Sequence, residues 1–279
     1  MMEIRHFTAE DIPFALEQTS REGWFTCAGA FESYLDHDPN GNFIGWMNGD
    51  RAGMITTTRY VTSAWIGNLI VPPKLRSRGV GRRLMQHALD HLQSAGMRTI
   101  RLDGDPPGLA LYRSLGFVDE CESLRFRFKS RDSSAVSGVE PLAPAHMKHV
   151  LEFDASRFGD DRARLLEMLY LRGKSAFIAW RDSAVSGYVF TEETGLGLRI
   201  APCVATDTET AKRLLQAVSS RAGSQMVTLG ILEANRAGRK LLDSLGFRPM
   251  PSCRRMVLGE HLAEGIHGCI FGIGGGAIG

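Results

Sequence analysis

Val71-Pro-Pro-Lys-Leu-Arg-Ser-Arg-Gly-Val-Gly-Arg-Arg-Leu84 is the stretch that says most about how this 279-residue chain folds. The apolar run at residues 66–71 predicts a short strand that ends at Pro72-Pro73. Residues 81–95 predict an amphipathic helix that stops at Gly96. Four apolar residues lie on one stripe of that helix: Leu84, Ala88, Leu89 and Leu92. A strand, a glycine-containing loop and a helix in this order indicate an α/β unit.

The loop before this helix has the features of an anion site. The amides of a first helical turn lack partners within the helix, and the helix dipole is positive there. Gly79 and Gly81 carry no side chains, so an anion can approach the backbone closely. Five cations surround them with no acid between, at Lys74, Arg76, Arg78, Arg82 and Arg83. These features favour a phosphate, and in particular a diphosphate, over a solvated basic helix start whose glycines serve packing.

The same unit occurs twice in the chain. Ser114-Leu115-Gly116-Phe117 returns 130 residues later as Ser244-Leu245-Gly246-Phe247, and Arg83-Leu84-x-Gln86 returns as Arg213-Leu214-x-Gln216. Each copy has the order strand, helix, strand, helix, strand, which predicts a mixed sheet with flanking helices. We therefore expect an α/β (α+β) chain of two tandem domains, residues 1–130 (copy one) and 139–279 (copy two), joined by a Ser-rich linker near residues 130–138.

Copy two offers a comparison for the glycine loop. Its aligned residues, Thr206-Asp-Thr-Glu-Thr-Ala211, contain neither glycine nor arginine. Thr206 and Glu209 are spaced as a capping box, which would satisfy the free amides of the helix from within the protein. Asp207 and Glu209 would also repel a phosphate. The fold thus does not require the glycine motif, and in copy one that motif indicates a ligand.

The composition excludes several other classes. The chain has 33 Lys+Arg and 31 Asp+Glu, a formal net charge of +2, so that any phosphate binding depends on local charge. The balanced charge and the lack of aromatics among the cations argue against nucleic acid as a partner. Five scattered cysteines without a Cys-x-x-Cys pair argue against a disulfide framework. No run of about 18 apolar residues occurs, and no signal-peptide core is seen, so we expect a cytoplasmic protein with no membrane segment.

Two further features carry weaker predictions. His87 and His91 lie four residues apart on the predicted helix, but the sequence offers no third ligand, so we expect no metal. Residues 268–279 alternate apolar residues with glycine, which predicts a final strand that packs on the sheet, in copy one, against the alternative of a frayed tail.

Val-x-Pro-x-x-Arg-x-x-Gly-x-Gly, followed about 30 residues later by Leu-Tyr-x-x-x-Gly-Phe, resembles the GCN5-related N-acetyltransferase (GNAT) family. The resemblance covers copy one well and copy two in pattern only. The whole chain is similar to tandem GNAT proteins of the YitH-like bacterial type, whose second half is degenerate. It implies an acetyl-CoA-dependent N-acyltransferase.

The resemblance also implies a cofactor site for acetyl-CoA in copy one. The backbone of Leu69, Ile70 and Val71 would pair with the pantetheine arm like an added strand and would stabilise the oxyanion. The diphosphate would be held by the amides of one loop, comprising Arg76, Ser77, Arg78, Gly79, Val80, Gly81 and Arg82. Asp105 stands where many relatives carry an Asn that contacts CoA, and Gly108 where they carry Ala.

Three residues are catalytic candidates. The family commonly has a tyrosine at the position of Tyr112, whose hydroxyl protonates the departing thiolate; the alternative is a core aromatic. Copy two has Leu242 there, so packing accepts an aliphatic side chain. Asp103 and Glu22 are candidates for the general base, although each could be a solvated acid and a water relay could replace both.

These features predict direct transfer of an acetyl group to an unidentified small-molecule or protein amine. The alternative is a non-catalytic acyl-CoA-binding sensor that keeps the cofactor site. We expect copy two to be non-catalytic and the chain to be a monomer, as an internal pseudo-dimer, or a homodimer.

Overall fold

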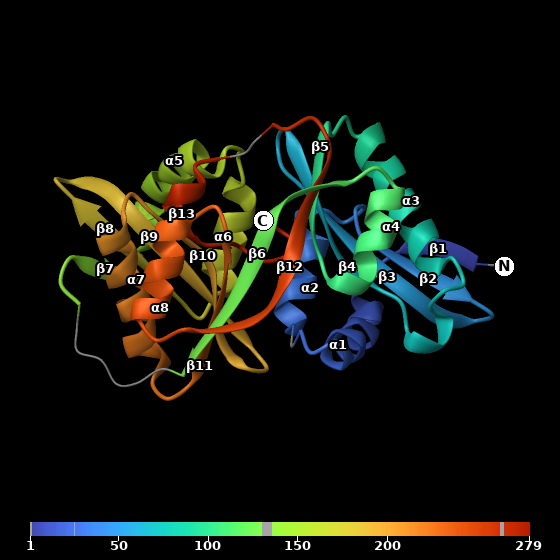
Figure 1. Ribbon diagram of the computed structural model, residues 1–279, viewed down its shortest axis with the longest axis horizontal. Coiled ribbons are helices and arrows are strands. Elements are labelled where there is room, and N and C mark those ends of the chain that lie inside the picture. Colours follow the sequence, from blue (N-terminus) through green and yellow to red (C-terminus); the bar gives the residue numbers. More distant parts are fainter. Residues whose placement is uncertain (1, 25, 130–135, 263–264) are drawn as a thin grey trace.

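The computed structural model describes residues 2–24, 26–129, 136–262 and 265–279 (Figure 1). The predicted linker lies for the most part outside these residues. Copy one contains β1 (Met2–His6), α1 (Ile12–Arg21), α2 (Ala28–His37), β2 (Phe43–Met47), β3 (Asp50–Arg59), β4 (Ser63–Ile70), α3 (Val80–Ser94), β5 (Thr99–Gly104), α4 (Leu109–Ser114) and β6 (Val118–Lys129). The strand and the helix expected around the glycine loop are β4 and α3.

Copy two repeats most of this order. It contains β7 (Val139–Pro141), α5 (Met147–Phe158), α6 (Ala163–Arg172), β8 (Ser175–Arg181), β9 (Ala184–Thr194), β10 (Gly197–Ala205), α7 (Thr208–Ala222), β11 (Met226–Leu232), α8 (Arg236–Ser244), β12 (Arg248–Gly259) and β13 (Ile270–Gly272). β4 and β5 are parallel, as are β10 and β11, and the other pairs are antiparallel. The mixed α/β fold expected from the sequence is confirmed.

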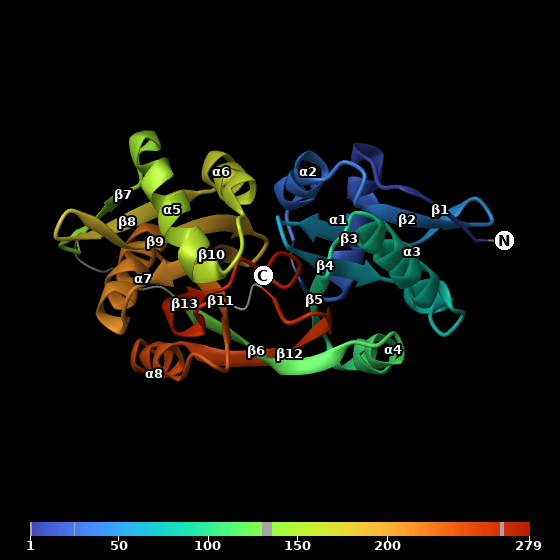
Figure 2. The ribbon, with the colours of Figure 1, turned by 90° about the horizontal axis from the view of Figure 1, so that it is seen from above.

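The two copies share one 13-stranded sheet and exchange their final strands. The order is β1-β2-β3-β4-β5-β12-β6-β11-β10-β9-β8-β7, with β13 on β10. Thus β12 of copy two pairs with β5 of copy one, and β6 of copy one pairs with β11 of copy two. β6 and β12 lie antiparallel side by side and link the two halves of the molecule along the lower edge of Figure 2. Each copy therefore lacks its own last strand and borrows that of the other.

The helices bury the two faces of the sheet in three apolar clusters. In copy one, α3 packs on β3 and β4 through Leu84, Met85 and Leu92, none of which is exposed. A second cluster lies beneath α7 and α8 of copy two. The third is shared, because α1 and α2 of copy one and α5 and α6 of copy two enclose it together. A core common to both copies joins them into one folded unit.

Residues 270–279 form the last part of this shared core. The predicted final strand is present as β13, but its placement in copy one is wrong, because β13 pairs with β10 of copy two. Within residues 270–279, it is the part after β13 that contacts copy one. Ile273, Ala277 and Ile278 are 2–8% exposed, so this segment is packed.

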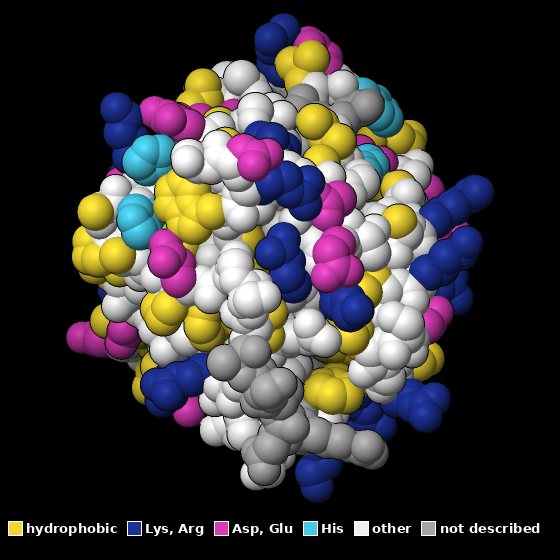
Figure 3. All heavy atoms as spheres, turned by 90° about the vertical axis from the view of Figure 1, so that its left-hand side faces the viewer, with side chains coloured by type: hydrophobic (Ala, Val, Ile, Leu, Met, Phe, Trp, Pro, Cys, Tyr) yellow, Lys and Arg dark blue, Asp and Glu magenta, His cyan; other side chains and the backbone are white. Residues whose placement is uncertain are grey.

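The surface of copy two carries mixed charge. Figure 3 shows its outer end, where Lys and Arg side chains alternate with Asp and Glu and neither sign gathers into a single field. In the described part of the chain, no helix has the length and apolarity needed to cross a membrane.

Candidate active site

The loop between β4 and α3 presents free backbone amides. Ser77 and Gly79 adopt left-handed conformations, with φ of 61° and 79°, which turn the chain sharply into the helix. The first helical amide that reaches a carbonyl is that of Arg83, which donates to Gly79 at 3.1 Å. The amides of Val80, Gly81 and Arg82 precede it and point out of the helix end. Successive outward amides in a glycine-containing turn form a concave site for an anion.

The cations of this loop fall into two groups. Arg82 donates to the Ser114 hydroxyl at 2.6 Å, and Arg83 to the Met2 carbonyl at 2.9 Å, so both are held by the protein. Lys74 and Arg78 are exposed and make no ion pair or hydrogen bond with any described residue. These two cations are therefore available to a phosphate.

Copy two lacks this site in structure as well as in sequence. Only Thr206 and Asp207 separate β10 from α7. Asp207 is the N-cap, and its carboxylate accepts from the Thr210 amide at 2.9 Å. The capping box expected from Thr206 and Glu209 is wrong by one residue, because Asp207 itself reaches the amide. Burial acts to raise the pKa of Asp207, but hydrogen bonds from Thr210, Thr206 and Arg181 outweigh it and lower that pKa to about 2.

β4 and β5 separate next to this loop. Their parallel pairing runs from Ser63 and Thr99 to Trp65 and Arg101 and then stops. Asn68 has a φ of 49°, within a stretch where the register of β4 against β3 shifts. Leu69, Ile70 and Val71 thus border an opening between the two strands. On the β3 side Ile70 remains paired with Met54, so the strand is anchored along one edge only.

Tyr112 lies on α4 across this opening. Its ring packs tightly against backbone, because a Cβ on Gly104 or on Gly108 would lie 2.7 Å from Tyr112 Cε2. The side chain is 9% exposed, and burial, then the charge of Asp105, then Cys253 raise the pKa of Tyr112 above its usual value. The phenol is therefore protonated at neutral pH. Beside it, the Cys253 thiol donates to Asp105 Oδ1 at 3.0 Å.

Asp103, one candidate base, is fully engaged in ion pairs. Its carboxylate accepts from Arg255 and Arg125, each at 2.8 Å, and from the Ser123 hydroxyl at 2.6 Å. The side chain is 0% exposed. Burial opposes its ionisation, yet Arg255 and then Arg125 lower the pKa of Asp103 to about 2. This arrangement favours a role in holding strands together over one in accepting protons near neutral pH.

Glu22, the other candidate base, lies at the end of α1 near the mouth of the opening. It forms an ion pair with Arg76, whose Nε also donates to the Val71 carbonyl at 2.9 Å. The Glu22 side chain is 30% exposed, so solvent can reach it.

Two family models match the chain in succession. One, described as the acetyltransferase (GNAT) family, matches residues 5–117, and the other, described as an acetyltransferase (GNAT) domain, matches residues 150–272. The chain belongs to the GNAT family. It is an acetyltransferase of the GNAT type with two GNAT domains in tandem, as the sequence predicts.

Individual relatives agree with this assignment. A holothin acyltransferase from Pseudoalteromonas sp. is 25% identical over 243 residues, which cover 86% of this chain and 82% of that protein. A [ribosomal protein bS18]-alanine N-acetyltransferase from Escherichia coli is 34% identical over 79 residues, 27% of this chain and 53% of that one. A solved structure from Pyrococcus horikoshii, described as a candidate acetyltransferase, superposes with a TM-score of 0.87 at 28% identity, covering 100% and 96% of the two chains.

The GNAT motifs predict the glycine loop and Tyr112 but miss the residues that copy two supplies beside them. Cys253 and Arg255 both come from β12, and the Arg255 guanidinium also lies 4.4 Å from the centre of the Trp65 ring. Neither residue belongs to a GNAT motif of copy one. The only signal for them in the sequence is the repeat itself, since residue 255 repeats residue 125, and both arginines bind Asp103.

A metal centre has no support in the described residues, which contain no group of three His, Cys, Asp or Glu side chains placed to hold a metal. His87 and His91 instead pack edge-on against Phe43, with ring centres 4.5 and 5.4 Å away.

Proposed function

We propose that copy one binds acetyl-CoA along the end of β4 and at the start of α3, and transfers the acetyl group directly to an amine. The observation that carries this proposal is the difference between two equivalent helices. The first-turn amides of α3 are free beside the exposed Lys74 and Arg78, whereas in α7 the Asp207 carboxylate accepts from the first-turn amide of Thr210. A helix start left open in one copy and closed in the other supports an anionic ligand in the first.

The residues present fit such a ligand. A Cβ on Gly81 would lie 3.6 Å from Leu111 Cδ2 and 3.7 Å from Val71 Cγ2, so the protein itself leaves room there for a side chain. Since Gly81 carries no side chain, a diphosphate could approach the amides at this helix start closely. The amides of residues 76–82 would bind it, and the backbone of Leu69, Ile70 and Val71 would pair with the pantetheine arm. Asp105, near Tyr112, would contact the same arm.

Acetyl-CoA would supply an activated thioester. In the transfer a C–N bond forms and the thioester C–S bond breaks. The amides near Leu69 would stabilise the developing negative charge on the carbonyl oxygen. Tyr112 would give its hydroxyl proton to the leaving sulfur, since its raised pKa keeps it protonated until then. Glu22 would take the proton of the amine, directly or through water, because its carboxylate is accessible and that of Asp103 is not.

The acceptor is a primary amine, of a small molecule or of a protein. The names of the relatives include holothin and the alanine of ribosomal protein bS18 as acceptors. We also propose a cytoplasmic monomer. All five cysteines are free thiols, as is usual in a reducing compartment, and the strand exchange that joins the two copies takes place within one chain.

A turnover assay with purified protein tests the proposal. Release of free CoA from acetyl-CoA is measured with a panel of polyamines, amino sugars, amino acids and peptides with N-terminal alanine, alongside calorimetric titration with acetyl-CoA. Tight binding with amine-dependent release is expected. Binding without release for any amine, unaffected by Tyr112→Phe, would instead support the acyl-CoA sensor. Absence of binding would overturn both.

A further inference from the structure

Residues 275–279 fill the narrow end of the opening between β4 and β5. A Cβ on Gly67 of β4 would lie 2.1 Å from Ala277 Cβ, so Ala277 sits directly on that strand. A Cβ on the preceding Gly276 would lie 3.5 Å from Asp103 Cβ on β5. Two consecutive residues therefore contact both strands, immediately beyond the last paired residues, Trp65 and Arg101. This segment acts as a wedge that spans the gap, and we refer to residues 275–279 as the wedge.

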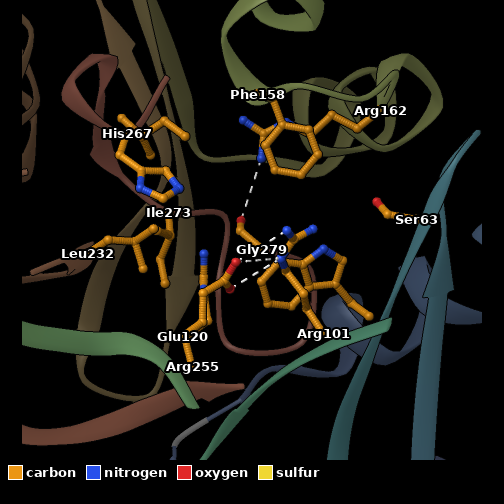
Figure 4. A pocket seen from close by; sticks show the side chains of 12 residues that line it. Ser63, Arg101, Glu120, Phe158, Arg162, Leu232, Arg255, His267, Ile273 and Gly279 are labelled. Carbon is orange, nitrogen blue, oxygen red and sulfur yellow. Dashed lines mark hydrogen bonds and ion pairs between the residues drawn. The ribbon is translucent and has the colours of Figure 1, made fainter. Parts of the chain in front are cut away.

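The wedge is held rigidly by both copies. The Tyr60 hydroxyl of copy one donates to the Ile278 carbonyl at 2.6 Å, in a buried position. The Gly279 amide closes a tight turn onto the Gly275 carbonyl at 3.0 Å, and the Ile273 amide donates to Gly230 of β11 at 2.9 Å. Figure 4 shows Gly279 enclosed at the interface, with Arg162 on one side and Arg101 on the other. Ala277 is thus a fixed wall.

Acetyl-CoA, bound as proposed, would have its acyl end next to Ala277. With the diphosphate at the start of α3 and the pantetheine along Leu69–Val71, the acyl group lies at the end of the arm farthest from α3. That end faces Gly67 and the place where β4 and β5 rejoin. A longer acyl chain would have to continue into the space that Ala277 occupies. In a close-packed site a wall of this kind discriminates by single methylenes.

We propose that the wedge, supplied by copy two, is the acyl-length selector of copy one, with Ala277 as its specificity-determining residue, and that it restricts the donor to acetyl-CoA. This inference rests on the proposed function. It also gives copy two a specific task in the reaction, since the atoms nearest to a Cβ on Gly67 are those of Ala277, at 2.1 and 2.6 Å.

Titration with acyl-CoA thioesters tests the selector without an acceptor. Acetyl-, propionyl- and butanoyl-CoA are titrated into the full chain by calorimetry. Wild-type protein is expected to bind butanoyl-CoA at least tenfold more weakly than acetyl-CoA, about the discrimination that a methylene or two brings in a tight pocket. Ala277→Gly removes the methyl that faces Gly67. It should reduce the ratio of the affinities for acetyl-CoA and butanoyl-CoA by roughly tenfold, chiefly because the variant binds butanoyl-CoA more tightly.

Two other variants make the result specific. Gly276→Ala places its methyl 3.4 Å from Arg125 Nη2 and 3.5 Å from Asp103 Cβ, which are ordinary contacts, so that the protein should fold. The methyl narrows the gap between β4 and β5 and should increase the ratio of the affinities for acetyl-CoA and butanoyl-CoA. Ala217→Gly on α7 is the control, because Ala217 has the same 8% exposure as Ala277 but lies beneath no part of the opening. It should leave the ratio unchanged even where it lowers the melting temperature.

The outcomes separate the two proposals. Equal affinity of the wild type for all three thioesters, or a ratio that is the same in the wild type, Ala277→Gly and Gly276→Ala, would overturn the selector while leaving acetyl-CoA binding intact. Failure of folded wild-type protein to bind any of the thioesters would overturn the proposed function itself.

Discussion

Replacement of Gly81 by alanine should raise the stability of the protein and lower its affinity for acetyl-CoA. Gly81 is the second residue of α3, with an ordinary helical backbone, and its nearest neighbours would lie 3.6 Å or more from the new methyl group. The folded protein therefore accommodates alanine without strain. The methyl would lie against Leu111 and Val71 at the helix start, next to the amides where the diphosphate is proposed to bind.

The two effects have opposite signs and estimable sizes. Alanine in place of glycine at a compatible helical position stabilises by about 0.4–1 kcal/mol, mainly through the unfolded chain. At about 2.1 cal/mol/K per residue, a chain of 279 residues unfolds with an entropy of about 0.6 kcal/mol/K, so Tm should rise by about 1–2 °C. Loss of one charge-assisted hydrogen bond costs about 1.5–3 kcal/mol, which weakens acetyl-CoA binding by about 10- to 150-fold.

Differential scanning calorimetry and isothermal titration measure the two quantities on the same samples. Gly29→Ala is the matched control, since Gly29 is the second residue of α2 and a Cβ there would find nothing closer than the Cys27 sulfur at 4.0 Å. It should gain similar stability without loss of affinity. A stable Gly81→Ala protein that binds acetyl-CoA as tightly as the wild type would refute the assignment of the diphosphate to these amides.

Three other substitutions test the chemistry and the ion pairs. Tyr112→Phe should lower kcat about 100-fold or more in the CoA-release assay with acetyl-CoA affinity unchanged, and an unaltered kcat would exclude the phenol as the acid. Glu22→Gln should lower kcat at least about tenfold, with little change in Tm, because the ion pair is partly exposed. If the variant kept the wild-type kcat, water rather than Glu22 would accept the proton of the amine. Asp103 has a pKa of about 2 in the folded protein against an ordinary 3.8, so the roughly 2 kcal/mol that it contributes is complete above about pH 5 and is lost as the pH falls through 4 towards 2. Asp103→Asn should therefore be less stable at pH 7 in urea titrations and should lack this acid-dependent loss; equal acid sensitivity of both proteins would contradict the ion-pair assignment.

The sequence predicts local structure well where the apolar periodicity and the glycine and proline residues that end helices and strands indicate the same boundaries. The helix expected at residues 81–95 is α3, at Val80–Ser94, and the strand expected at residues 66–71 is the second half of β4, which spans Ser63–Ile70. In each case apolar periodicity, proline and glycine mark the same boundaries. The glycine loop and Tyr112 were placed by the same motifs, and the structure brings both to the opening between β4 and β5. Their roles in binding and catalysis stay predictions.

Strand exchange could not be predicted from the same pattern. β6 and β12 are repeats of each other, so each carries the alternation needed to pair with either β5 or β11. Nothing local distinguishes pairing within a copy from pairing between copies. The decisive contacts, such as those of Arg255 and Arg125 with Asp103, are between residues distant in the chain, at sequence separations of 152 and 22. The position of residues 270–279 depends on the same long-range arrangement.

Strand exchange also gives copy two, which lacks the glycine loop, a part in the site proposed in copy one. β12 gives copy one the strand next to β5, the thiol beside Asp105 and the guanidinium that binds Asp103. Residues 275–279 then occupy the gap between β4 and β5. Copy two has no open helix start of its own, because Asp207 caps α7 without a ligand, while β12 and residues 275–279 still border the site proposed in copy one. The two domains share one fold, and the proposed site is built from residues of both.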